Sequence, residues 1–142
     1  MSDQLFNSYE LSRRWFDFCF ENPEEITLQD ILSHKIRQQR NYLKGGFYLI
    51  KNTKNGKCYV GKSKDYMSRL KQHIYKSSSK TKIDKSLNED PKAFKFYLLA
   101  NYKDIGINFF NRKLETIIEH IFITVAKSFY PEGYNNIHYG HL

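Results

Sequence analysis

The chain has 142 residues, of which 40% are apolar and 16% aromatic, so one domain with a substantial core can form. No apolar run approaches the roughly 20 residues of a membrane-spanning helix, and the N-terminus lacks the layout of a secretory signal. The two cysteines, Cys19 and Cys58, have the spacing of neither a disulfide nor a zinc framework. We therefore expect a soluble, cytoplasmic protein without a membrane partner.

The net charge of +8 is unevenly divided along the chain. Residues 1–44 carry 6 basic and 7 acidic groups, net −1, whereas residues 45–142 carry 17 basic and 8 acidic groups, net +9. A positive segment with interleaved aromatic residues predicts a polyanionic partner such as nucleic acid, because neutralising phosphates releases counterions. A lysine-rich surface that serves solubility is the alternative, and charge alone does not decide between them.

The first third of the chain predicts two helices. Residues 3–21 place one apolar stripe on a helix that ends before Asn22-Pro23, and its members are Leu5, Leu11, Trp15, Phe18 and Cys19. Thr27 is the expected N-cap of a second helix, ended by Gly45-Gly46, whose apolar residues are Leu28, Ile31, Leu32 and Ile36. We expect residues 1–44 to be an N-terminal helical extension that packs on the main domain or pairs two protomers as a homodimer.

Residues 45–142 predict a small domain of the α+β class. Residues 47–52 and 57–61 favour two strands joined by a two-residue turn at Asn55-Gly56, and residues 93–99 alternate as a third strand. Ser63 can cap a helix over about 64–76, and a short helix is expected within 78–91. The last predicted helix, residues 112–127, has an apolar face made of Leu114, Ile117, Ile118, Ile121, Phe122 and Val125. We expect a three-stranded antiparallel sheet flanked by helices.

Residues 56–63, GKCYVGKS, match the P-loop pattern for nucleotide binding. That pattern requires an open loop of backbone N–H groups between a strand and a helix. Its middle residues here are Lys, Cys, Tyr and Val, which favour a strand instead. We interpret the match as coincidence and keep a P-loop nucleotide hydrolase as the weakest hypothesis.

The same segment, read more widely, resembles the GIY-YIG nuclease family. The first motif corresponds to Gly46-Phe47-Tyr48 and the second to Tyr59-Val60-Gly61, with Arg69 and His73 following in SRLKQH. Further on, LETIIEHIFI is similar to the metal-binding glutamate helix of the family, and Gly133-Tyr134-Asn135 to its GYN element. The resemblance covers roughly residues 46–136 and implies a GIY-YIG-like domain over residues 45–142.

The resemblance implies a divalent-metal-dependent DNA endonuclease. Glu119 would hold Mg²⁺ or Mn²⁺, with Glu115 one turn earlier as a competitor that the distance to Asn135 disfavours. Arg69 would offer its guanidinium to the phosphate, and Asn135 would brace the site. Tyr48 would be the general base, which requires nearby cations to lower its pKa, and Tyr59 would orient water or phosphate.

Several basic residues complete the expected site. His73, Lys57 and Lys62 are candidates for lowering the pKa of Tyr48 or for relaying its proton. We expect the DNA to be double-stranded. Contacts with its backbone are assigned to Lys57, Lys62, Lys64 and Lys71. The short chain beyond Asn135 favours a phage, mobile-element or restriction and defence nuclease, and a non-catalytic nucleic-acid-binding module on the same scaffold is the alternative.

Overall fold

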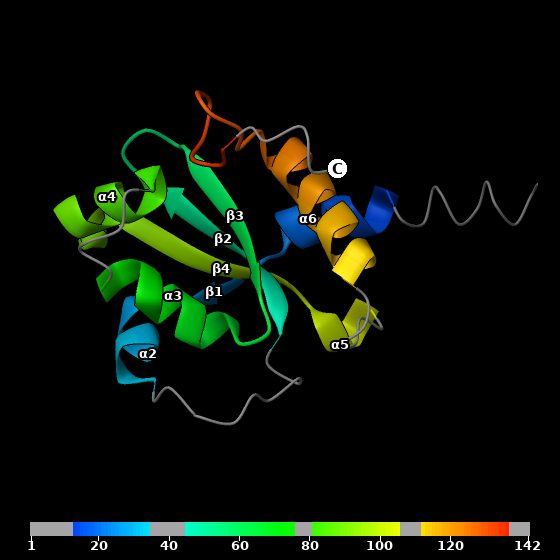
Figure 1. Ribbon diagram of the computed structural model, residues 1–142, viewed down its shortest axis with the longest axis horizontal. Coiled ribbons are helices and arrows are strands. Elements are labelled where there is room, and N and C mark those ends of the chain that lie inside the picture. Colours follow the sequence, from blue (N-terminus) through cyan, green and yellow to red (C-terminus); the bar gives the residue numbers. More distant parts are fainter. Residues whose placement is uncertain (1–12, 35–44, 76–80, 106–111, 137–142) are drawn as a thin grey trace, which may run out of the picture.

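The computed structural model describes residues 13–34, 45–75, 81–105 and 112–136. These residues form one antiparallel sheet with helices on both faces (Figure 1). The α+β class predicted from the sequence is confirmed. Among the described residues, no helix is long and apolar enough to cross a membrane.

The sheet has four strands in the order β1-β4-β2-β3, where three were predicted. The bounds of the strands are β1 Glu24–Ile26, β2 Gly46–Asn52, β3 Cys58–Ser63 and β4 Phe94–Asn101. The additional strand, β1, pairs with β4, although its two glutamates gave no strand pattern in the sequence. The proposed domain boundary near residue 44 stays a prediction, but a strand from residues 1–44 is part of this sheet.

The hairpin of β2 and β3 carries both tyrosine motifs. Tyr48 lies opposite Gly61 and Ile50 lies opposite Tyr59. The connecting loop is longer than predicted: Asn52 and Lys57 are joined by a backbone hydrogen bond of 2.8 Å around four loop residues. Gly56 has a φ of 75°, which explains why glycine is needed there. The predicted hairpin is confirmed, with a four-residue loop.

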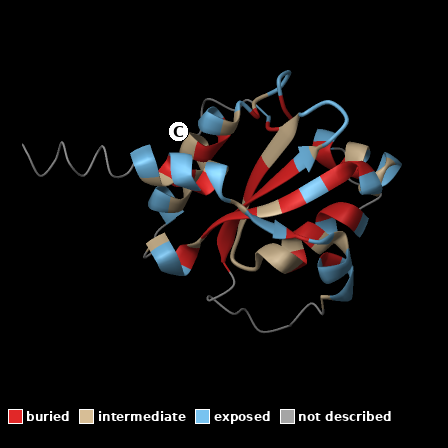
Figure 2. Cartoon of the chain, turned by 180° about the vertical axis from the view of Figure 1, so that it is seen from behind, coloured by how far each residue is buried: buried red, intermediate tan, exposed pale blue. Residues whose placement is uncertain are grey.

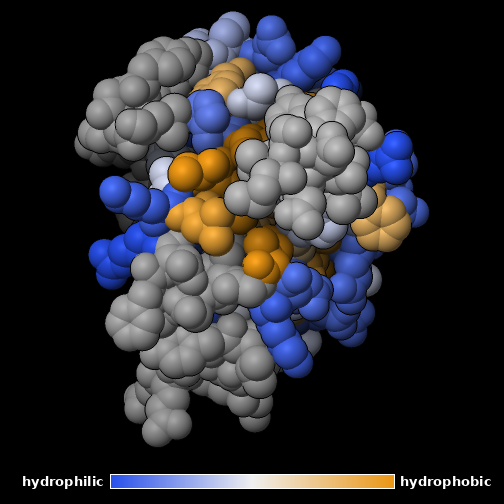
Figure 3. Space-filling model, turned by 90° about the vertical axis from the view of Figure 1, so that its right-hand side faces the viewer, coloured by the Kyte–Doolittle hydropathy of each residue, from blue (hydrophilic) through white to orange (hydrophobic). Residues whose placement is uncertain are grey.

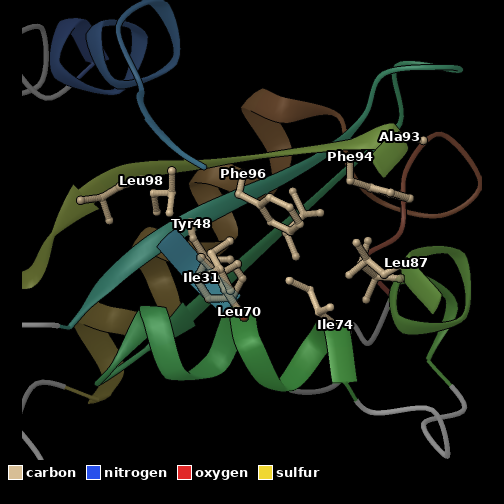
Figure 4. Packing of buried hydrophobic residues seen from close by; sticks show 12 residues of the cluster. Ile31, Tyr48, Leu70, Ile74, Leu87, Ala93, Phe94, Phe96 and Leu98 are labelled. Carbon is tan, nitrogen blue, oxygen red and sulfur yellow. The ribbon is translucent and has the colours of Figure 1, made fainter. Parts of the chain in front are cut away.

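Central strand β2 is buried on both faces, so it divides the core into two clusters (Figure 2). One face packs against the helix over residues 13–21 and against α6 (Arg112–Ala126), with Phe47 lying 5.4 Å from Phe122 between ring centroids. The other face packs against the helices α2 (Leu28–Ser33), α3 (Tyr66–Tyr75) and α4 (Lys82–Glu89). Figure 4 shows this second cluster, where Tyr48 from the sheet lies above Leu70 of α3.

The remaining helical segments are short: η2 spans Pro91–Ala93 and α5 spans Tyr102–Ile105. The pairing of β2 with β4 shifts register between Phe47 and Tyr48, so that Phe47 lies opposite Ala100 and Tyr48 opposite Leu98. Such a bulge re-aims the neighbouring side chains. It falls beside the tyrosine of the first motif.

The helix ends follow the sequence in part. Thr27 caps α2 by accepting a hydrogen bond of 3.1 Å from the backbone N–H of Asp30, as predicted. However, α2 ends at Ser33 rather than near Gly45, and the predicted member Ile36 lies outside the described residues. For α3, the carboxylate of Asp65 accepts from the N–H of Ser68, while Ser63 accepts from the N–H of Asp65, so the capping role predicted for Ser63 belongs to Asp65.

Two predicted apolar faces are rotated from their expected positions. In the first helix, Phe16 and Cys19 are buried and Phe18 is 59% exposed, while Leu5 and Leu11 lie outside the described residues. In α6 the buried residues are Ile118, Phe122 and Ile123, whereas Leu114, Ile117 and Val125 are exposed. Figure 3, which views the side of the molecule where α6 lies, shows apolar side chains at the surface. Periodicity found the helices but not which part of a wide apolar band faces inward.

Candidate active site

The tyrosines of the two motifs lie side by side over strand β3. Their ring centroids are 6.4 Å apart, and the hydroxyl of Tyr48 passes directly over Gly61. A Cβ atom on residue 61 would lie 2.3 Å from both Cζ and Oη of Tyr48. The glycine of the second motif therefore makes room for the tyrosine of the first.

Helix α3 brings His73 to this pair. His73 Nε2 lies 2.8 Å from Tyr48 Oη, and the ring of His73 lies 5.4 Å from that of Tyr59 between centroids. Tyr48 and His73 are each 1% exposed. His73 is thus in direct contact with the predicted base.

Burial raises the pKa of Tyr48 well above its usual value, and the nearby hydroxyl of Tyr59 and carboxylate of Glu119 add to that rise. The guanidinium of Arg69 acts in the opposite direction. Burial likewise raises the pKa of Tyr59 to about 12. In the metal-free protein the loss of hydration in the core outweighs the effect of Arg69, so the pKa of Tyr48 is raised where the sequence led us to expect cations to lower it.

Glu119 lies on α6, which packs against β3 from the other face of the sheet. Its Oε1 atom is 3.5 Å from Lys62 Nζ, which also donates a hydrogen bond of 3.0 Å to Thr116 Oγ1. Burial raises the pKa of Glu119, and Lys62 partly counters the rise. Lys62 is therefore part of the site and pairs with a carboxylate.

Electrostatic effects distinguish the two competing glutamates. The charge of Glu119 contributes to the raised pKa of both Tyr48 and Tyr59, so its carboxylate lies near enough to act on the tyrosine pair. The pKa of Tyr102, at the start of α5, is raised first by burial, then by a hydrogen bond and the charge of Glu115, and to a smaller extent by Glu119; Glu115 is not among the causes for Tyr48 or Tyr59. The side chains of Tyr48, Tyr59, Arg69 and Glu119 thus influence one another at the edge strand β3.

Asn135 holds the outer edge of β3. Its Oδ1 accepts a hydrogen bond of 2.9 Å from the N–H of Val60, and its Nδ2 donates one of 2.8 Å to the carbonyl of Val60. The preceding residue, Tyr134, donates its backbone N–H to the carbonyl of Cys58. Because β3 is an edge strand, these bonds replace those of a further strand and fix the segment that carries Tyr59 and Gly61.

The other predicted DNA contacts are placed differently. Lys71 Nζ donates a hydrogen bond of 2.7 Å to the carbonyl of His34, which ties α3 to the end of α2. Lys57 precedes β3 at the hairpin end, and Lys64 follows β3. Arg69 donates to Gln72 Oε1 at 3.2 Å. Of the four lysines, three therefore lie in or next to β3 and one lies on α3.

A metal ion at this site would be held by the carboxylate of Glu119. Among the described residues, no group of three His, Cys, Asp or Glu side chains could hold a metal. Mg²⁺, however, is commonly bound by one or two carboxylates together with waters and substrate phosphates. Glu119 fits a metal ion of that kind.

Residues 56–63 do not form a P-loop. Cys58–Ser63 is strand β3, paired with β2, so the backbone N–H groups do not surround a phosphate. The interpretation of that match as coincidence is confirmed, and the nucleotide-hydrolase hypothesis loses its basis.

Comparison with known proteins agrees with this geometry. The profile of the GIY-YIG catalytic domain matches residues 44–124, so the chain belongs to the GIY-YIG family. A curated relative, intron-associated endonuclease 1 of Enterobacteria phage T4, is 35% identical over 86 residues. That match covers 54% of this chain, which spans about a third (35%) of the relative.

Two solved structures share the fold. The catalytic domain of homing endonuclease I-TevI is 29% identical with a TM-score of 0.54, covering 67% of this chain and 100% of that one. A mutant of the catalytic domain of intron endonuclease I-TevI is 31% identical with a TM-score of 0.53, covering 65% of this chain and 92% of that one. The resemblance drawn from the sequence motifs is confirmed.

Asp84 is a candidate site residue that the sequence did not reveal. It lies in α4, is 2% exposed, and its Oδ1 is 2.5 Å from Nδ1 of His73. Residues 78–91 are mostly polar, so nothing in the pattern distinguished this aspartate from the other polar residues around it. The one available signal was its position on the helix: Asp84 lies on the same buried side of α4 as Ile83 and Leu87.

Proposed function

We propose that the chain is a divalent-metal-dependent DNA endonuclease that hydrolyses phosphodiester bonds. The observation that carries this proposal is the grouping of Tyr48, Tyr59 and His73 beside strand β3, with the charges of Arg69 and Glu119 acting on both tyrosines, in a chain of the GIY-YIG family. We further propose Mg²⁺ or Mn²⁺ as the ion, double-stranded DNA as the substrate, and a role in a phage, mobile element or restriction and defence system of a bacterial cell. The phage relative supports that setting.

In this proposal each side chain has one task. The guanidinium of Arg69 contacts the scissile phosphate and offsets the charge that develops on it. Tyr48 takes the proton of the attacking water and passes its own proton to His73, which lies 2.8 Å away. Tyr59, whose raised pKa keeps its hydroxyl protonated at neutral pH, donates a hydrogen bond to water or phosphate.

Glu119 would hold the cation, which when bound would stabilise the negative charge on a phosphate oxygen and on the departing 3′ oxygen. In the protein alone, Lys62 neutralises the half-buried carboxylate. Asn135 keeps the strand that carries the second motif in place through Val60. We also propose that the DNA backbone is contacted by Lys57, Lys62, Lys64 and Lys71. Residues 1–44 are proposed to pair two protomers.

The test is incubation of the purified chain with supercoiled plasmid and with phage DNA, in the presence of Mg²⁺ or of EDTA. We expect cut DNA with Mg²⁺, no cutting with EDTA, and ends that carry a 5′ phosphate and a 3′ hydroxyl. DNA binding without any cutting under these conditions would favour the non-catalytic binding module instead.

A further inference from the structure

Three buried side chains form a continuous chain of hydrogen bonds between the sheet and two helices. Tyr48 of β2 contacts His73 Nε2 of α3 at 2.8 Å, and His73 Nδ1 contacts Asp84 Oδ1 of α4 at 2.5 Å. Their exposed fractions are 1%, 1% and 2%. Asp84 lies outside the motifs that carry the family resemblance, so its burial against His73 calls for an explanation.

The chemistry of the groups fixes where the proton of the imidazole sits. A carboxylate can only accept hydrogen bonds, so the short contact with Asp84 places the proton of a neutral His73 on Nδ1. The Nε2 atom then carries a lone pair and accepts the hydrogen bond of the Tyr48 hydroxyl. Without Asp84, nothing in this contact would prefer that tautomer over the one in which Nε2–H faces Tyr48.

This tautomer matters because Tyr48 keeps its proton. Burial raises the pKa of Tyr48, so the hydroxyl is protonated at neutral pH. It can remove a proton from water only if its own proton leaves at the same time. The lone pair of His73 Nε2, 2.8 Å away, is the acceptor within reach.

We propose that Asp84 is a positioning residue that holds His73 in the Nδ1–H tautomer, so that His73 Nε2 receives the proton of Tyr48 during DNA cleavage. This inference rests on the proposed function and deepens it. The carboxylate also stabilises the imidazolium that forms, because the ion pair lies in the core and not in water. A buried carboxylate that served packing alone would cost stability without return.

The proton transfers and the cleavage of the phosphodiester bond form one balanced step. An O–H bond of water breaks and its proton goes to Tyr48 Oη, while the Tyr48 O–H bond breaks and its proton goes to His73 Nε2. The electron pair on the water oxygen forms the bond to phosphorus, and the 3′ oxygen departs with the pair of the broken P–O bond and takes a proton from solvent. His73 then returns its extra proton to solvent through Tyr48.

The experiment uses Asp84→Asn in the full chain, which keeps the size of the side chain but removes its charge. In ¹⁵N-histidine-labelled protein without DNA, the imidazole nitrogen shifts of His73, assigned with a His73→Gln variant, report the tautomer directly. We expect the Nδ1–H form in the wild type, and a mixed or Nε2–H form in Asp84→Asn. Cleavage by Asp84→Asn should fall at least tenfold, with DNA affinity unchanged.

The matched control is Asp90→Asn, which removes a carboxylate just beyond the same helix, where Asp90 pairs with Lys54 at the surface. Its cleavage rate and the His73 shifts should match the wild type. An Asp84→Asn protein that retains the wild-type tautomer, or that changes tautomer and still cuts at the wild-type rate, overturns the role of Asp84. A wild-type protein that cuts no DNA refutes the proposed function instead, a result that the NMR arm keeps separate.

Discussion

Gly61→Ala tests why the second motif ends in glycine. A Cβ atom at this position would lie 2.3 Å from Cζ and Oη of Tyr48 and 2.6 Å from Cε2. Since ordinary van der Waals contact begins at 3.4 Å, the ring must move by about 1 Å. The ring is 1% exposed and packed among core side chains, so it has little room to do so.

The cost follows from two effects of that displacement. Overpacking a well-filled core costs about 1–3 kcal/mol. Moving Oη by about 1 Å from its partner at 2.8 Å also breaks the hydrogen bond to His73 and leaves a buried nitrogen unpaired, for about 1–3 kcal/mol more. We expect Gly61→Ala to lower the free energy of unfolding by about 2–6 kcal/mol.

The assay is urea unfolding of a double-mutant cycle with Tyr48→Leu, because leucine is too short to reach over residue 61. In the Tyr48→Leu background, Gly61→Ala should cost less than about 0.5 kcal/mol. Gly56→Ala serves as the control, because its cost arises from a φ of 75° with nothing within 4 Å, and should be equal in both backgrounds. An equal cost of Gly61→Ala in both backgrounds would refute the steric explanation.

Three further changes have defined outcomes. Burial raises the pKa of Glu119, so its ionised form opposes folding, and Glu119→Gln should raise the melting temperature of the metal-free protein at neutral pH. This gain in melting temperature should shrink as the pH falls, because the wild-type carboxyl then takes up its proton. A gain that grows on acidification would show that the sign of this effect is wrong. Asn135→Ala leaves the buried N–H and carbonyl of Val60 unpaired and should cost about 2–4 kcal/mol in urea unfolding, whereas the exposed neighbour Asn136→Ala should cost almost nothing. DNA affinity, measured by fluorescence anisotropy at several salt concentrations, should fall steeply with salt, since residues 45–142 carry a net charge of +9; a flat response would indicate a merely solubilising surface.

The features that could be predicted from the sequence are those set by local patterns, such as strand alternation, helix capping and hairpin pairing. The alternating residues of β4, Phe94, Phe96 and Leu98, do face one cluster, and Thr27 does cap α2. The family motifs also identified Tyr48 and Tyr59, which meet because the hairpin pairs their strands in a fixed register. Short-range pattern and pairing were sufficient for these features.

Features set by tertiary contacts were not predictable in the same way. Strand β1 exists because β4 offers an open edge, and the Glu24-Glu25 pair in it has no strand preference of its own. The buried Asp84 and the pairing of Lys62 with Glu119 depend on which helices pack on which face of the sheet. The raised pKa of Tyr48 has the same origin, because burial is a property of the assembled core.

The role of Glu119 in hydrolysis is tested by comparing the two glutamates of α6, which lie one helical turn apart. Single-turnover cleavage of duplex DNA with Mg²⁺ is measured for Glu119→Ala and for its matched control, Glu115→Ala, at DNA concentrations that saturate binding. We expect a loss of at least about 10²-fold for Glu119→Ala with DNA binding retained, and a change within a few-fold for Glu115→Ala. Normal cleavage by Glu119→Ala, or an equal loss in both variants, would contradict the assignment of this carboxylate to the hydrolytic site.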